Sequence, residues 1–393
     1  MKRQRSTSRE ENSPLLSELK AQCDQGKISR REFIRYATLI GVSAGAAMNL
    51  AGIGGVKKAF AATIKRGGTL RVASPIHKMT HPAQISSIGP SNMLRQVAEY
   101  LTYTDNQGIT HPYLLKNWQA SQDLKTWTLN LRQGIRFNNG DELVADDVVF
   151  TMQQWLSKDI GSSLRGMVGS YLDSSGIEKT SRYQVVLHLK RPEIGIPEHL
   201  FHYPAYILNH RTFEGDFLRK PHGTGPYTLD NYREGEICVV KRRKDYWQKG
   251  SDGERLPYMD EMRFIDMGTE MAPQIAAIQS GEVDYIELGD ATGLDAYNVL
   301  KNDSNLLVQS IGTAQTRVLR MRTDVDPWKD NRVRTALKLC QNREKILALA
   351  YSSEGLLGHD THVSPMHPEY CQKDIPAYNP EKARQLLKEA GYP

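Results

Sequence analysis

The sequence predicts an α/β protein with more than one domain. Short stretches in which apolar and polar residues alternate, the pattern of half-buried strands, are interleaved along the chain with amphipathic helical patterns. A length of 393 residues is enough for two or three domains with cores of their own. The hydrophobic content of 39% and the charged content of 24% are ordinary for a soluble globular protein.

The formal net charge of +6 lies entirely in the N-terminal segment. Residues 1–61 hold 11 of the 51 Lys and Arg residues and 5 of the 45 Asp and Glu residues, which leaves 40 of each in the rest of the chain. A body without net charge gives no compositional reason to expect a nucleic acid or an anionic membrane surface as partner.

Residues 1–61, called the leader below, contain the elements of an export signal in their usual order. Ser29 to Arg35, SRREFIR, matches the twin-arginine pattern S-R-R-x-F-[LI]-[KR]. Its recognition residues are Arg30, Arg31 and Phe33. A Gly- and Ala-rich apolar run follows, and Ala59 and Ala61 form an A-x-A cleavage site. We expect cleavage after Ala61, export by the twin-arginine translocase and a periplasmic location. The alternative is an uncleaved membrane anchor, for which the apolar run is barely long enough.

The clearest strand and helix pattern lies between Leu115 and Trp155. Thr126 to Arg132 alternates strictly between apolar and polar residues, which predicts a half-buried strand. Two glycine turns follow, the second at Asn139-Gly140, and an apolar helical stripe begins beside Asp146 and Asp147. We expect a hairpin that leads into an amphipathic helix, whose start is held by Asp146 or Asp147 because no hydroxyl residue precedes it. The large side chains that we assign to its core are Trp127 and Trp155.

Three segments together carry a family resemblance. The first is the stretch just described, and the second is the glycine turn and strand GTGPYTL at residues 223–229. The third is a pair of helix starts, NRVRTAL at residues 331–337 and NREKI at residues 342–346. In this combination the chain resembles the family 5 solute-binding proteins, the extracytoplasmic receptors of oligopeptide, dipeptide and nickel ABC importers. Val144 departs from the family, which usually has Thr or Ser there. The resemblance covers Lys65 to Pro393 but only the front part of the family's fold.

The resemblance implies an α/β, two-lobed periplasmic-binding-protein (flytrap) fold with an extra subdomain inserted in lobe 1 and with lobe 2 incomplete. In such receptors the ligand is enclosed between the lobes by hinge closure. We expect one more strand at Arg317 to Met321. The expected division is residues 62–104 and 181–288 for lobe 1, 105–180 for the inserted subdomain and 289–393 for lobe 2.

The implied function is that of a periplasmic receptor that binds a peptide or similar small solute between its lobes and delivers it to an ABC permease in the inner membrane. Peptide is favoured by family frequency alone, so a nickel complex, an oligosaccharide or an opine stays open. The resemblance implies a monomer without catalytic residues, metal or cofactor. The residues that family position suggests near the ligand are Ser87, Ile88, Gly89, Glu287, Leu288, Gly289, His359, Asp360, Thr361 and His362.

The cysteines and histidines do not form a metal-binding pattern. Cys238 lies in a strand pattern and Cys340 on a helix, so we interpret both as core residues, while a bridge between Cys340 and Cys371 stays open. Without a further ligand at suitable spacing, we interpret two groups of histidines as polar residues. These groups are His199 and His202, and His359, His362 and His367.

Two other functions remain open at this point. An exported hydrolase is disfavoured because the chain after the leader lacks the motifs G-x-S-x-G and H-E-x-x-H. An inactive, truncated receptor fragment is the second alternative, since members of the resembled family continue well past the position of Pro393.

Overall fold

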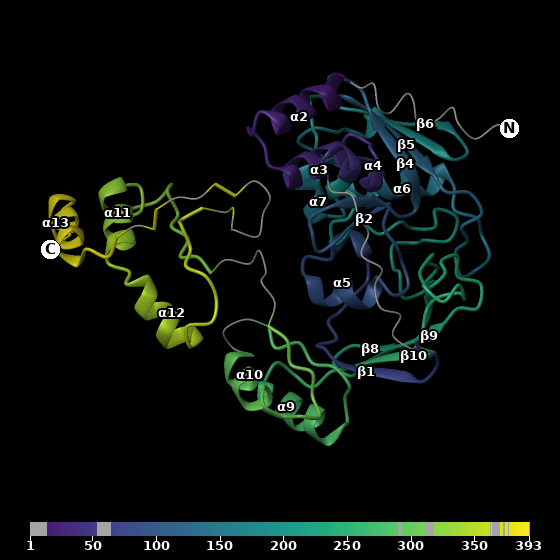
Figure 1. The fold of residues 1–393 in the computed structure, drawn as a ribbon. Coiled ribbons are helices and arrows are strands. Elements are labelled where there is room, and N and C mark those ends of the chain that lie inside the picture. The colour runs from purple at the N-terminus through teal and green to yellow at the C-terminus, as the bar shows by residue number, and fades with distance from the viewer. Residues whose placement is uncertain are drawn as a thin grey trace. The chain divides into compact units, whose positions relative to one another are not determined.

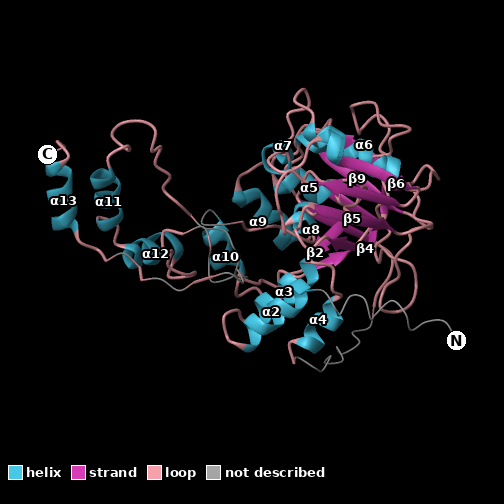
Figure 2. Cartoon of the chain, turned by 90° about the horizontal axis from the view of Figure 1, so that it is seen from above, coloured by secondary structure: helices cyan, strands magenta, loops and turns pink. Residues whose placement is uncertain are grey.

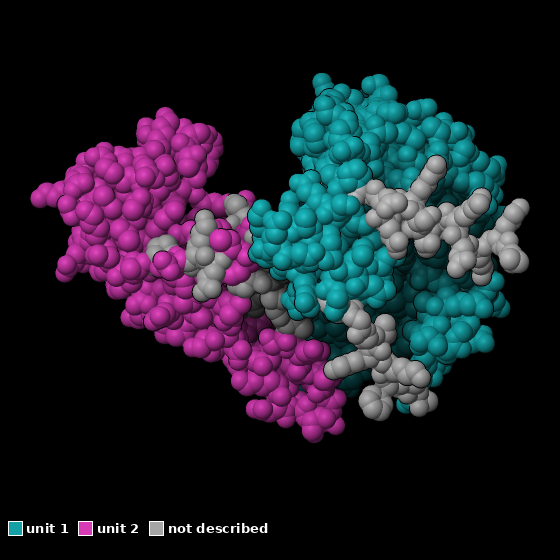
Figure 3. Space-filling view, turned by 45° about the horizontal axis from the view of Figure 1, so that its top comes forward, with its two compact units in different colours: residues 1–287 teal, residues 288–393 magenta. Residues whose placement is uncertain are grey.

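The computed structural model describes residues 14–52, 64–289, 293–310, 317–361, 363, 370–371, 374–375 and 377–392. Two compact units divide the chain, unit 1 up to Glu287 and unit 2 from Leu288 (Figure 3). Unit 1 contains the described part of the leader and two four-stranded sheets, whereas the described elements of unit 2 are helices (Figure 1).

The first sheet joins the start of the body to three later strands. In spatial order these are β1 (Thr69–Ala73), β10 (Glu261–Ile265), β9 (Ile237–Arg242) and β8 (Tyr227–Arg233). β1 is parallel to β10, and the other neighbours are antiparallel. Helix α9 (Met271–Ser280) packs on this sheet through a small apolar cluster of Ala73, Ala277 and Val283. The helix ends at Gly281, whose φ of +73° is the left-handed conformation that glycine adopts without strain.

The second sheet extends from Leu115 to His188. In spatial order its strands are β4 (Leu115–Ala120), β5 (Thr126–Leu131), β7 (Gln184–His188) and β6 (Ile177–Ser181), all antiparallel. The strand predicted from Thr126 therefore forms, with β4 and β7 as partners. The second strand of the predicted hairpin, around Ile135 and Phe137, does not form. Across the Asn139-Gly140 turn there is a single β-bridge, between Arg136 and Glu142. The apolar alternation at this point arises because the side chains of Ile135 and Phe137 are buried, and not because their backbone pairs with another strand.

Helices and short segments complete unit 1 around one shared core. They are the helices α5 (Ile88–Leu94), α6 (Ala145–Leu156), α7 (Ser163–Val168) and α8 (Ile196–His199), the strands β2 (Thr102–Thr104) and β3 (Thr110–Pro112), and the single turns η1 (Pro82–Gln84) and η2 (Ser174–Gly176). The main apolar cluster contains Trp127 and Trp155, as predicted, and also Val240 and Phe264 of the first sheet. Both sheets are thus held by a continuous core.

The described part of the leader, residues 14–52, forms three helices in unit 1. They are α2 (Pro14–Asp24), α3 (Arg30–Leu39) and α4 (Ala44–Leu50). Figure 2 shows these helices grouped on one side of unit 1, where α3 contacts β3 and α8. Across the described residues, no helix combines the length and the apolar character needed to cross a bilayer.

Unit 2 is helical in the residues that the structure describes. Its elements are α10 (Leu294–Leu300), α11 (Asn331–Leu339), α12 (Arg343–Tyr351) and α13 (Pro380–Glu389). α11 packs against α13, where Val333, Ala336 and Ala383 are buried. The strand predicted at Arg317 to Met321 is wrong, since none of these residues is part of a strand in the described part of unit 2.

The cysteines separate into one core residue and three others. Cys238 is buried in β9, as predicted. Cys340 ends α11 and is exposed, so its interpretation as a core residue is wrong, because the buried stripe of that helix stops at Ala336. The bridge between Cys340 and Cys371 is not formed.

Candidate functional site

In unit 1, the predicted ligand residues lie at the start of α5. Ser87 occupies the N-cap position without a side-chain capping bond, and Ile88 and Gly89 form the first turn. Pro90 lies inside the first turn of the helix, which tolerates proline because its N–H groups are not used in hydrogen bonds within the helix. Ile88 is 52% exposed, and an added Cβ on Gly89 would meet no atom within 4 Å. Both residues are therefore accessible from the surrounding space.

The rest of α5 is anchored in the core, which fixes this accessible turn. Ser91 Oγ lies 2.6 Å from the Tyr206 hydroxyl and 3.1 Å from the Tyr100 hydroxyl. The two tyrosine rings stack with centroids 4.4 Å apart. Met93 and Leu94 on the same helix are buried in the main cluster. Such support from packed side chains is what a binding surface requires for a defined geometry.

The second predicted group follows a segment that is attached to β1 of the first sheet. Asp284 N donates to Arg71 O at 2.8 Å, and Ala73 N donates to Tyr285 O at 3.0 Å. The Arg71 and Asp284 side chains also form an ion pair of 2.7 Å. Beyond this attachment come Glu287, which ends unit 1, and Leu288 and Gly289, which begin unit 2.

The third predicted group lies in unit 2, beside α12. Asp360 adopts a φ of +60°, and its Oδ1 accepts a hydrogen bond of 2.7 Å from Arg343 in the first turn of α12. Arg343 also donates to Gly358 O at 2.8 Å, so this arginine fixes the segment. The His359 ring lies against Tyr370, whose hydroxyl is 3.2 Å from Nε2. Thr361 Oγ1 donates to the Val363 carbonyl at 2.9 Å. The predicted residues His362, Ala59 and Ala61 lie outside the described residues.

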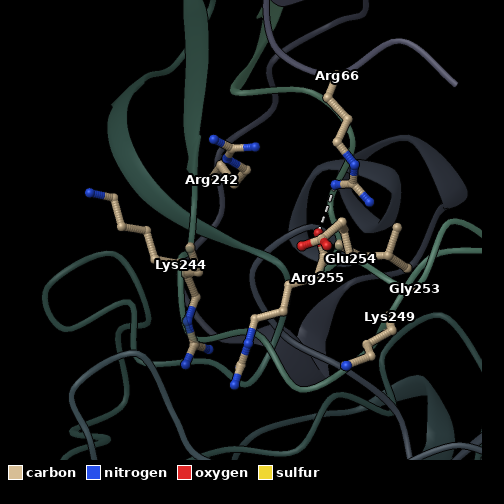
Figure 4. A pocket seen from close by; sticks show the side chains of 9 residues that line it. Arg66, Arg242, Lys244, Lys249, Gly253, Glu254 and Arg255 are labelled. Carbon is tan, nitrogen blue, oxygen red and sulfur yellow. Dashed lines mark hydrogen bonds between the residues drawn. The ribbon is translucent and has the colours of Figure 1, made fainter.

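A basic cavity of about 450 Å³ opens elsewhere in unit 1 (Figure 4). It is lined by Arg66, Arg242, Arg243, Lys244, Lys249, Gly253, Glu254, Arg255 and Leu256. Most of its guanidinium groups are already paired: Arg66 donates to both oxygens of Asp252 at 2.7 Å, and Arg242 forms an ion pair of 2.8 Å with Asp260. The exposed ammonium groups of Lys244 and Lys249 leave the cavity positive. None of the predicted ligand residues lines it.

Arg243, one of these lining residues, has a structural role that the sequence analysis missed. Only 5% of the residue is exposed, and its guanidinium donates to the carbonyls of Gly223 and Gly225 at 3.2 Å each. An added Cβ on Gly223 would lie 2.0 Å from Val97 O, and Gly225 N donates to the same oxygen at 2.8 Å. The GTGP segment is thus a close backbone contact clamped by Arg243, so it is a marker of the fold and not of the ligand.

A buried carboxyl group, Glu99, is the other feature without a sequence signal. Its Oε1 accepts a hydrogen bond of 2.5 Å from the Tyr246 hydroxyl, and its Oε2 accepts one of 3.1 Å from the Trp247 indole. Burial raises the pKa of Glu99, and these two hydrogen bonds oppose that shift. Burial and the nearby Glu99 carboxylate also raise the pKa values of Tyr246 and Tyr113. Glu99, Tyr113 and Tyr246 come from three different segments of the chain, which this cluster holds together. Because Glu99 is buried, the cluster offers no open binding site.

Metal ligands are not gathered anywhere in the part of the chain that the structure describes: no group of three or more His, Cys, Asp or Glu side chains is placed to hold an ion. His199 hydrogen bonds to the Tyr171 hydroxyl through Nδ1 at 2.8 Å, and His202 packs against Tyr203. Burial lowers the pKa of both histidines. These two rings therefore act as packed polar groups.

Comparisons with known proteins agree on one family. The model of the bacterial extracellular solute-binding proteins, family 5, matches residues 110–393. A probable peptide ABC transporter periplasmic-binding protein of Sinorhizobium fredii is 27% identical over 397 residues, which cover 93% of this chain and 69% of the relative. The glutathione-binding protein of Salmonella typhimurium is 28% identical over 284 residues, 71% of this chain and 53% of that protein. The chain thus spans little more than half the length of this second relative.

Solved structures show the same architecture. The ABC transporter-associated periplasmic binding protein DppA from Helicobacter pylori, in complex with the peptide STSA, has a TM-score of 0.72 at 22% identity, over 84% of this chain and 67% of that one. NikZ from Campylobacter jejuni, in complex with Ni(L-His), has a TM-score of 0.68 at 21% identity, over 82% of this chain and 63% of that one. At such identities the likeness establishes the fold alone.

Proposed function

The chain belongs to family 5 of the bacterial extracellular solute-binding proteins and has the α/β periplasmic-binding-protein fold, and on this premise we propose that it is the solute receptor of an ABC transporter. It binds a peptide or a similar small solute and delivers it to a permease in the inner membrane. The observation that carries the proposal is the family match over residues 110–393. Its family comprises binding components of transporters and not enzymes.

The solute contacts that we propose are the groups predicted from the sequence. In unit 1 they are the accessible first turn of α5, with Ser87, Ile88 and Gly89, and the segment from Glu287. In unit 2 they are Leu288, Gly289 and the segment from His359 to His362. The anchoring of α5 through Ser91 supports this choice, because a rigid base under an exposed turn limits the ordering cost of binding.

We also propose that the protein reaches the periplasm through the twin-arginine pathway. The support is the SRREFIR motif, followed by an apolar run and the A-x-A sequence at Ala59 to Ala61. Replacing both Arg30 and Arg31 by Lys keeps the charge and should abolish export, measured as processed protein in the periplasmic fraction. Normal export of that double variant would contradict the proposal.

Binding is tested with the full-length protein and a set of candidate solutes. Peptides, glutathione, a nickel–histidine complex and opines are added in turn, and the free energy of unfolding is measured. A true solute at about 100 times its Kd raises that free energy by about 2.7 kcal/mol. If none of these solutes stabilises the protein, the receptor function is wrong.

A substitution at Gly89 locates the site. Gly89→Arg should abolish the stabilisation, because the long side chain would project from the first turn of α5 into the proposed site. Gly166→Arg is the matched control, since Gly166 is also a helical glycine with no atom within 4 Å of an added Cβ. Gly89→Ala should bind normally. Equal binding by Gly89→Arg and the control would exclude this turn from the site.

A further inference from the structure

The twin-arginine motif is folded into the first turns of α3. Ser29 Oγ accepts a hydrogen bond of 3.2 Å from Glu32 N, and Ser29 N donates to Glu32 Oε2 at 2.6 Å, which forms a capping box. The two arginines, Arg30 and Arg31, are exposed, whereas Phe33 is 0% exposed. One part of the motif is therefore accessible and the other is covered.

Phe33 is buried in a small apolar cluster that is separate from the main core of unit 1. Its buried members are Leu16, Phe33, Ile34, Ala37, Val42, Ala47, Ala51 and Ile109. All except Ile109 come from the leader, and Ile109 lies directly before β3 of the body. The leader helices thus fold on one another, and the cluster reaches the body at one apolar residue.

Polar contacts attach α3 to the body at two further places. The Arg35 guanidinium forms a bidentate pair with Glu198 of α8, with Nε 2.9 Å from Oε1 and Nη2 3.0 Å from Oε2. The indole of Trp118 in β4 donates to Leu39 O at 2.8 Å, and Trp118 is buried. A bidentate pair and a buried hydrogen bond fix both the register and the orientation of a docked helix.

Gly41 allows the leader to approach this closely. Its φ of +105° lies in the left-handed region, and an added Cβ would be 2.6 Å from the Trp118 carbonyl oxygen. Any other residue would be strained twice here, by its backbone conformation and by the clash. At this position of the apolar run, glycine is therefore required by the close contact between the leader and β4.

We propose that the surface around Ile109, Trp118 and Glu198 is a docking surface for the leader, which acts as an autoinhibitory ligand within the precursor. The inference rests on the export signal proposed above. In the docked state Ile109 of the body completes the apolar cluster that covers Phe33, and the translocase binds only the state in which the leader is released and this cluster is open. Its apparent affinity for the precursor is then reduced by the fraction of molecules that are released.

The first experiment measures docking in the full-length precursor with its leader uncut. Gly41→Ala pushes a methyl group against the Trp118 carbonyl and leaves SRREFIR unchanged. Gly45→Ala is the matched control, because it makes the same change in the same apolar run, where an added Cβ meets nothing within 4 Å. Hydrogen–deuterium exchange of the peptide covering residues 33–40 should be about tenfold faster in Gly41→Ala and within about twofold of wild type in Gly45→Ala. Equal exchange in wild type and Gly41→Ala would overturn docking.

The second experiment measures recognition. Binding of each precursor to membrane vesicles that contain the translocase should rise by the same factor as the released population. Glu198→Gln changes only the body and leaves the whole leader sequence intact, so it should raise exchange and binding together even if Gly41→Ala damages the signal. Faster exchange in Glu198→Gln without stronger binding would refute the autoinhibitory role.

A separate control distinguishes this inference from the export proposal. The double variant Arg30→Lys and Arg31→Lys should lose binding in the wild-type, Gly41→Ala and Glu198→Gln backgrounds. If it binds like the wild type, twin-arginine export is wrong and the autoinhibitory role fails with it, while the exchange experiment still decides whether the leader is docked.

Discussion

Removal of the Asp147 carboxylate should destabilise unit 1 more than any change to the acidic residue next to it. The side chain of Asp147 is 0% exposed. Its Oδ2 accepts a hydrogen bond of 2.8 Å from Val144 N, which completes the start of α6 in place of a hydroxyl cap. Its Oδ1 accepts one of 3.0 Å from His210 N and lies 2.7 Å from His210 Nδ1. One carboxylate thus holds a helix start and a distant segment.

The expected cost follows from these contacts. A hydrogen bond to a charged group contributes about 1.5–3 kcal/mol, and loss of a helix cap costs about 1 kcal/mol. Because the donors share one carboxylate, the values do not add, and we expect about 3–5 kcal/mol for Asp147→Ala. Asp146→Ala removes a side chain that is 41% exposed and paired with Lys179, so it should cost about 0–1 kcal/mol.

The assay must report on unit 1 alone, since two units can unfold separately. Trp328 is the one tryptophan in unit 2, and the other four of the five belong to unit 1. In a Trp328→Phe background, fluorescence during urea unfolding therefore follows unit 1. The midpoint should fall for Asp147→Ala while the denaturant slope stays unchanged. Equal costs for Asp146→Ala and Asp147→Ala, or a cost below about 1 kcal/mol for Asp147→Ala, would refute the reasoning.

Three further predictions concern groups described above. Because burial raises the pKa of Glu99 in the folded state, its contribution to stability is complete below the unfolded pKa of about 4.3 and declines as pH rises through the folded pKa. Glu99→Gln should remove this decline from urea unfolding measured upward from that unfolded pKa, and an unchanged pH dependence would contradict it. Burial raises the pKa of Cys238 to about 12, so a thiol reagent should label exposed Cys340 in the native protein and Cys238 only after unfolding, as peptide mapping would detect. Gly281→Ala should cost about 1 kcal/mol because of its left-handed φ, whereas Gly166→Ala in α7 should stabilise by about 0.5–1 kcal/mol in the same unfolding assay; equal signs would contradict the argument.

The sequence was most informative where the pattern was local. Alternation from Thr126 predicted β5 correctly, because one face of that strand packs into the core. The same alternation failed at Ile135 and Phe137, where buried side chains lack a ladder. A period of two shows that alternate side chains are buried, but it does not show with which strand the backbone pairs. β5 pairs with β4 and β7, whereas no strand pairs with residues 135–137 in the described part of unit 1.

Contacts between distant residues could not be predicted from the sequence. The sequence left Asp146 and Asp147 as alternatives for the helix start, and its contact with the distant His210, which no local pattern indicates, belongs to Asp147. Arg243 lies in a run of four charged residues, 241–244, with nothing in the sequence to distinguish it, yet it clamps the GTGP turn. In the same way, the family resemblance indicated α5 as part of the site, whereas its anchoring through Ser91, Tyr100 and Tyr206 required the tertiary structure.

Cleavage after Ala61 would change the surface of the protein where the leader is docked. The departing leader would leave Trp118 without the Leu39 acceptor, Glu198 without Arg35, and Ile109 without its apolar neighbours. An indole donor, a carboxylate and an aliphatic side chain would then be presented to solvent only by the processed molecule. A binding partner that recognises this combination of groups would bind the processed protein and not the protein that still carries its docked leader.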